Sequence, residues 1–177
     1  MKNTYVMSYF PLLSIMLFCL SFSVRIELTL IDFLKKTGIY QGMREFLSNS
    51  EIKLTLFVVL YVILFMVFAA LKLVANTINE LSLLFFSKDT EGESLKSIRA
   101  GSLIYLVGGT LSVVSIYSYI GIIAIFTLST IVYFIYFVYK ISGNLTMSGT
   151  IGVVFFQVIV WSTILLSLIF SGWKLYN

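Results

Sequence analysis

LTLFVVLYVILFMVFAAL, residues 54–71, is a run of eighteen residues without a single charged side chain. A run of about 18 or more apolar residues is long enough to cross a bilayer as a helix. Four other blocks share this character, and the expected spans are 5–24, 54–75, 100–117, 119–139 and 150–170. The sequence therefore predicts an all-α protein, a polytopic transmembrane helix bundle of about five spans that forms a single integral membrane domain over residues 1–177.

The composition indicates that the lipid bilayer is the main partner. Of the 177 residues 59% are hydrophobic and 11% are charged, whereas a soluble domain carries about 25% charged residues. The net charge of +4 comes from twelve Lys and Arg against eight Asp and Glu, an excess typical of loops that face anionic lipid. Because no basic patch is interleaved with aromatic residues, we expect no nucleic-acid partner.

The chain has no histidine and only one cysteine, Cys19. These counts exclude disulfides, histidine-ligated metals and Cys/His nucleophile pairs. Intramembrane proteolysis would need a Ser/His dyad, paired aspartates or a metal site, and the apolar blocks carry none of these. We therefore expect no enzyme and no cofactor, with Cys19 as a small apolar residue of the first block.

The first apolar block allows two interpretations. Ser21-Phe22-Ser23 offers a small-x-small cleavage site of the kind found in signal peptides. We favour an uncleaved span instead, because block 5–24 is about 20 residues long and Pro11 falls within its first two turns, where proline is tolerated.

The segment 25–53 is too polar to span and too apolar for a simple loop. On a helical period its polar side chains share one face and its apolar side chains another: Arg25, Thr29, Asp32 and Lys36 against Ile26, Leu30, Ile31 and Leu34. This pattern predicts an amphipathic interfacial segment between spans one and two. Ser48 and Glu51 then match an S-x-x-E capping box, so the next helix should begin near Ser48.

Helical character continues beyond the second span through Lys72 to Phe86. Four side chains form a candidate polar membrane face on this extension: Lys72, Asn76, Asn79 and Glu80. We favour a register in which Lys72 lies at the interface and snorkels. In the alternative register the span covers 63–84, and the polar side chains lie at mid-membrane, where an ionisable group indicates function.

Four residues are candidates for helix packing. Gly108, Ser112 and Ser115 leave one face of the third span without bulk, which lets another helix approach closely. The fourth span follows so soon that it should form an antiparallel hairpin with the third. Gln157 is the strongly polar residue of the fifth span, and such a residue most often bonds to a neighbouring helix.

Thr90 and Glu93 match another capping box, which predicts that a helix begins there and leads into the third span.

Positive charges do not decide the orientation. With five spans, six Lys or Arg residues fall on each side: Lys2, Lys72, Lys88, Lys96, Arg99 and Lys140 on one, and Arg25, Lys35, Lys36, Arg44, Lys53 and Lys174 on the other. We choose the amino terminus inside, because the α-amine adds one charge to that side and 87–99 is the most hydrophilic stretch.

Several strings of this sequence resemble the YufK-like proteins of spore-forming Gram-positive bacteria, a family of small membrane proteins. They are KNTY at 2–5, YFPLL at 9–13, IYQGMREFLS at 39–48 and FAALKLVANTINELSLLFFSKDTEG at 68–92. The resemblance implies a bacterial plasma membrane as the location. It implies no activity and no functional residue.

Two functions are compatible with these patterns. The leading hypothesis is a non-enzymatic accessory or assembly protein that acts through helix contacts with another membrane protein or with itself. The alternative is a small oligomeric transporter or channel that uses the polar face of the second helix. A membrane enzyme ranks third.

Overall fold

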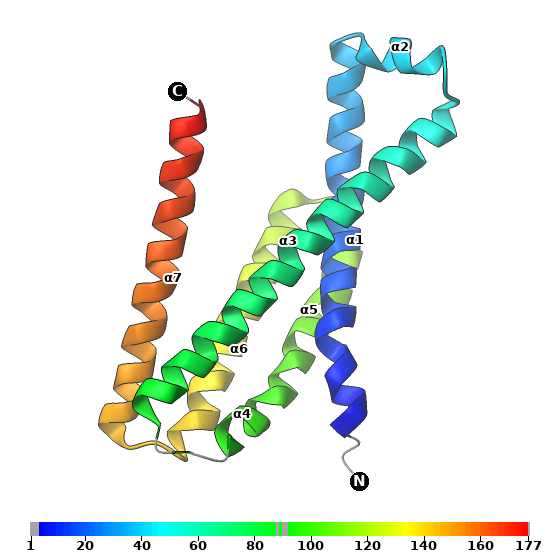
Figure 1. Ribbon diagram of the computed structural model, residues 1–177. Helices are drawn as coiled ribbons and strands as arrows, with labels where there is room; N and C mark the ends of the chain where they lie inside the picture. The colour runs from blue at the N-terminus through cyan, green and yellow to red at the C-terminus, as the bar shows by residue number, and fades with distance from the viewer. Residues whose placement is uncertain (1–3, 88, 90–91, 177) are drawn as a thin grey trace. The chain divides into compact units, whose positions relative to one another are not determined.

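The computed structural model describes residues 4–87, 89 and 92–176 (Figure 1). Helices make up 90% of the described residues, which contain no strand. The five-span prediction is confirmed, because five helices are long and apolar enough to cross a membrane. The elements are α1 Thr4–Lys36, α2 Ile39–Arg44, α3 Asn49–Phe86, α4 Glu93–Ile98, the 3-10 turn η1 Arg99–Gly101, α5 Ser102–Val114, α6 Tyr119–Ser142 and α7 Met147–Tyr176.

α1 differs from its expected boundaries. It runs unbroken to Lys36, so the first span and the predicted amphipathic stretch from Arg25 are one helix. No glycine or proline lies between Val24 and Lys36, and the helix ends just before Gly38, which adopts φ 77°. The short helix α2 then connects α1 to α3 crosswise (Figure 1). Its Tyr40 packs into a cluster with Ile31 of α1 and Ile52 of α3.

The capping box at the start of α3 is confirmed. The Ser48 backbone N–H donates to Glu51 Oε2 at 2.8 Å, and the Glu51 N–H donates to Ser48 Oγ at 3.3 Å. The second expected box cannot be placed, because Thr90 lies outside the described residues, as do Lys2 and Lys88 of the charge count. Helix α4 begins at Glu93, directly after Gly92 with φ 71°.

The chain divides into two compact units. Unit 1 consists of Met1–Leu71 and Ala100–Tyr133, and unit 2 of Lys72–Arg99 and Phe134–Asn177. In unit 1, α1 and α5 run parallel and side by side (Figure 1). Their contacts show this direction: Ser14 of α1 lies beside Gly109 of α5, and Ser21, further along α1, lies beside Ser112, further along α5. The centre of unit 1 holds three packed rings, with Phe18 and Phe68 each perpendicular to Phe126 at 5.2 and 5.4 Å between ring centroids.

Unit 2 is organised around an antiparallel pair formed by the second half of α3 and the first half of α7. Phe86, the last residue of α3, lies against Gly152 and Phe156, near the start of α7. The connections gather at this end, where Asn144 Nδ2 donates to Ser94 Oγ at 3.3 Å and the Ser94 N–H donates to Asp89 Oδ2 at 2.7 Å. Such a concentration of polar groups is expected at a membrane boundary, because polar connections lie outside the hydrocarbon core.

Candidate functional site

The four polar residues of α3 do not share one environment. Asn79 is 8% exposed, Lys72 is half-buried, and both Asn76 and Glu80 are exposed. The helical period explains the division, because Asn79 lies about 100° around the helix from Glu80, while Asn76 lies only about 40° from it. Leu73 and Thr77 are exposed beside Asn76 and Glu80. We call these four exposed residues the α3 polar face: Leu73, Asn76, Thr77 and Glu80. Lys72 stands at its edge.

Asn79 and Gln157 join α3 to α7. Gln157 Nε2 donates a 2.7 Å hydrogen bond to Asn79 Oδ1, and Gln157 Oε1 accepts one from Trp161 Nε1 at 3.2 Å. Gln157 is 2% exposed. The sequence grouped Asn79 with the polar stripe, whereas the structure turns it away from that stripe and towards α7.

This hydrogen bond sets the depth of α3. Gln157 lies seven residues into the apolar stretch 150–170, which is about 10 Å at about 1.5 Å per residue. Asn79 must lie at the same depth, because the two side chains are bonded. An independent measure agrees, since Asn79 precedes the polar connection at Ser87 by eight residues, about 12 Å.

The geometry therefore favours the register that the sequence ranked second. Glu80 neighbours Asn79 and lies at nearly the same depth. Lys72 is seven residues further along α3, about 10 Å deeper, which keeps it within a hydrocarbon core about 30 Å thick. A span that ended at 75 would leave Asn79 outside the membrane while its hydrogen-bond partner Gln157 lay inside.

The three small residues of α5 face different neighbours. The Ser112 hydroxyl is 2.9 Å from that of Ser21 in α1, and neither side chain is exposed. A Cβ on Gly108 would overlap the Ser129 hydroxyl of α6 and would stand 3.3 Å from Phe18 Cζ. Ser115 ends α5 and contacts Gly121 at the start of α6. The structure thus divides them between α1 and α6, and the contacts of Gly108 and Ser115 join the hairpin.

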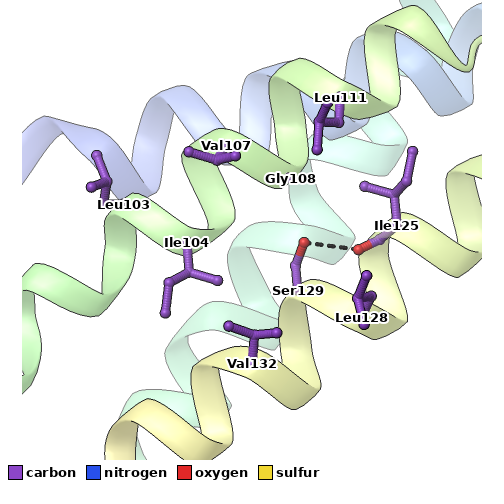
Figure 2. Close-up of a pocket in the computed structure, with 9 residues that line it drawn as sticks. All are labelled: Leu103, Ile104, Val107, Gly108, Leu111, Ile125, Leu128, Ser129 and Val132. Atoms are coloured by element: carbon purple, nitrogen blue, oxygen red, sulfur yellow. Dashed lines mark hydrogen bonds between the residues drawn. The ribbon is translucent and has the colours of Figure 1, made fainter.

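An open apolar groove runs between α5 and α6 in unit 1 (Figure 2). It has a volume of about 350 Å³ and is lined by Leu103, Ile104, Val107, Gly108, Leu111, Ile125, Leu128, Ser129 and Val132. The Ser129 hydroxyl donates to the Ile125 carbonyl at 2.8 Å, the dashed line in Figure 2. Because this polar group is already bonded within its own helix, the groove presents an apolar lining.

One polar contact was not predicted from the sequence. The Arg25 guanidinium carbon stands 4.7 Å from the centroid of the Tyr119 ring, close enough for a cation–π interaction. The Tyr119 hydroxyl lies 3.0 Å from Thr29 Oγ1 and donates to the Arg25 carbonyl at 3.3 Å. The residues are about 90 positions apart in the chain, so local pattern carried no signal of this contact.

Comparison with known proteins places the chain in a family. Residues 27–177 match the family of unknown function DUF5366. The chain belongs to this family. It is also similar to the "Uncharacterized membrane protein YufK" of Bacillus subtilis (strain 168), with 43% identity over 177 residues, which cover all of this chain and 96% of that protein. No solved structure matches it. The resemblance noted in the sequence is thereby confirmed.

In this DUF5366 chain the described residues contain no group of three or more His, Cys, Asp or Glu that could hold a metal ion. The feature that demands explanation is the α3 polar face. Its exposed amide and carboxyl lie on a spanning helix, at the depth of a buried glutamine.

Proposed function

We propose that this multi-pass membrane protein is a non-enzymatic accessory or assembly protein of the bacterial plasma membrane that acts through helix contacts. The observation that carries the proposal is the exposure of Asn76 and Glu80 on α3 at the depth of the Gln157–Asn79 hydrogen bond. The relative in Bacillus subtilis supports a bacterial membrane as the location.

The physical argument concerns the cost of facing lipid. Even on the gentlest scale a charged side chain at the centre of a bilayer costs about 2.5 kcal/mol. An amide side chain without a hydrogen-bond partner also loses free energy in hydrocarbon. A helix from another protein chain offers polar partners and removes both costs, so the α3 polar face is suited to bind such a helix.

Photocrosslinking tests this proposal in native membranes. A photoreactive residue at Thr77 probes the face without removing Asn76 or Glu80, and the same probe at Val58 serves as the control, because Val58 is 48% exposed on the purely apolar part of α3. We expect a discrete protein adduct from position 77 and only lipid adducts from position 58. Lipid adducts alone from both positions would falsify the proposal.

A second candidate is a small oligomeric transporter or channel. The specific observation in its favour is the row of Lys72, Asn76 and Glu80, which follow one another at four-residue spacing on a spanning helix. A polar row of this kind suits a water-filled pathway between protomers.

Water access separates the two candidates. Single cysteines at 72, 76 and 80, in a background with Cys19→Ser, are treated with a membrane-impermeant thiol reagent. A pathway predicts graded labelling that reaches position 72 from one side, and labelling that an added permeant solute slows. A buried helix contact predicts protection of all three positions.

A further inference from the structure

We propose that the α3 polar face binds a second copy of the same chain in the opposite membrane orientation, with the two α3 helices crossing at Asn76. This inference rests on the proposed function, because it names the partner that the face contacts. It commits to a homodimer whose twofold axis lies in the membrane plane.

The order of charges along α3 carries the proposal. Lys72 lies four residues before Asn76, and Glu80 lies four residues after it. When two antiparallel helices cross at one residue, each position before the crossing meets the equivalent position after it in the partner. Lys72 of each copy therefore meets Glu80 of the other, which makes two identical ion pairs in one self-complementary contact.

The same geometry supplies a hydrogen bond at the centre. Asn76 of one copy meets Asn76 of the other, and an amide carries both a donor and an acceptor, so the pair can bond to itself. Lys72 and Glu80 lie only about 6 Å from the crossing along the helix axis. At the small crossing angles usual for membrane helices, side chains at that distance still touch.

A partner in the same orientation fits poorly. In a parallel pair crossing at Asn76, each Lys72 would approach the other Lys72 and each Glu80 the other Glu80. Like charges in a medium of low dielectric constant repel strongly. The charges of two α3 helices are therefore complementary when the helices run antiparallel, and they repel each other when the helices run parallel.

The distribution of positive charge allows both orientations. With Lys72 inside the membrane, five Lys or Arg residues remain on the amino-terminal side and six on the other. The side with more of these residues usually stays in the cytoplasm. Here the α-amine offsets the difference of one, so the charges of the two sides give almost no preference for either orientation. Both orientations should then coexist in one membrane, as an antiparallel dimer requires.

Cysteine crosslinking between two differently tagged copies of the full chain tests the arrangement. All variants carry Cys19→Ser, and a membrane-permeant oxidant forms disulfides, which require Cα atoms about 4.4–6.8 Å apart. We expect disulfides for Asn76→Cys with itself and for Lys72→Cys in one copy with Glu80→Cys in the other. We expect none for Lys72→Cys with itself or Glu80→Cys with itself.

Charge reversal provides a second measurement that does not depend on thiols. Lys72→Glu and Glu80→Lys should each reduce the photocrosslink between two copies, formed from a photoreactive residue at Thr77, at least tenfold, because each places like charges together. The double variant Lys72→Glu/Glu80→Lys should restore it, because both pairs re-form with reversed sign. Val58→Glu serves as a control for the mere addition of charge to α3.

Three outcomes overturn the proposal. Crosslinks of positions 72 and 80 each with themselves, without the mixed product, show a parallel pair. Absence of any self-crosslink while position 77 still gives an adduct with a different protein rejects the second copy but leaves the proposed function standing. Absence of both kinds of adduct rejects both.

Discussion

The amide of Gln157 and the side-chain oxygen of Asn79 are joined by a hydrogen bond of 2.7 Å between α7 and α3. This bond indicates how deep α3 lies in the membrane, because the position of Gln157 within the apolar stretch 150–170 gives the depth of that residue. Asn79 must lie at the same depth, which decides between the two registers of α3 that the sequence allowed. The inferred depth of Lys72 and Glu80 rests mainly on this contact.

Replacing Gln157 by leucine should weaken the pairing of α3 with α7. The hydrogen bonds to Asn79 and from Trp161 are lost, and polar contacts between membrane helices contribute about 0.6 to 2 kcal/mol. We expect a loss of this size in the free energy of unfolding measured in detergent. Val158→Leu is the control, since Val158 is 54% exposed.

Adding Asn79→Leu to Gln157→Leu provides the check on mechanism. Because both partners then become apolar, the double variant should lose less than the sum of the two single losses. Strict additivity would show that the two side chains do not act on one another.

The spans were predictable because a bilayer demands long apolar runs, and such runs are visible in any single sequence. The end of α1 was not, since Arg25 interrupts hydrophobicity without interrupting helix formation. The sequence pattern grouped Asn79 with Lys72, Asn76 and Glu80, so it predicted neither the direction of this side chain nor its partner. Nothing local in the sequence connects Asn79 to Gln157, Arg25 to Tyr119 or Gly108 to Ser129, because each contact joins positions that are far apart in the chain.

Gly108→Leu should destabilise the α5–α6 hairpin. Even a single Cβ at this position overlaps the Ser129 hydroxyl, and overpacking of this kind costs about 1–3 kcal/mol or more. Detergent stability of the purified chain measures the effect. Gly172→Leu is the matched control in a membrane helix, because a Cβ there meets nothing within 4 Å.

A suppressor can locate the overlap. Ser129→Ala removes the hydroxyl that a Cβ on Gly108 would strike first, so Gly108→Ala/Ser129→Ala should be more stable than Gly108→Ala alone. If the second substitution brings no recovery, the close approach of α5 and α6 at this point is refuted.

Tyr119 should contribute to unit 1 in two separable ways. Tyr119→Phe removes the hydroxyl contacts with Arg25 and Thr29 but keeps the ring under the guanidinium, and we expect a loss of about 1 kcal/mol. Tyr119→Leu also removes the ring and should cost roughly 0.5–1 kcal/mol more. Equal effects of the two substitutions on thermal stability would exclude a contribution from the cation–π contact.

Lys72→Ala distinguishes the two registers of α3 by magnitude. At an interface the change should stay within about 0.5 kcal/mol. At membrane depth, in the proposed dimer, it leaves Glu80 of the other copy without its opposite charge, and breaking a buried pair costs about 3–5 kcal/mol. We expect the larger loss in the membrane-embedded protein, measured by the temperature at which the assembled species disappears. Lys96→Ala on α4 is the control, because Lys96 is exposed outside the apolar stretches.

Orientation should respond to small changes in charge. Two reporters, one active only inside the cell and one active only outside, are fused in turn to the carboxyl end of the full chain, and we expect activity from both.

Asn3→Lys with Glu93→Lys adds positive charge to the amino-terminal side, which is then retained in the cytoplasm. Because five spans place the two ends on opposite sides, activity should shift towards the outside reporter. Glu45→Lys with Ser50→Lys adds charge to the other side and should shift activity towards the inside reporter. Both pairs use positions at or near polar connections, and Glu45, Ser50 and Glu93 are exposed, so packing should change little. A parent protein that activates one reporter alone, and keeps doing so in both charge variants, has an orientation fixed by something other than its lysines and arginines, and its α3 helices could not pair in opposite directions.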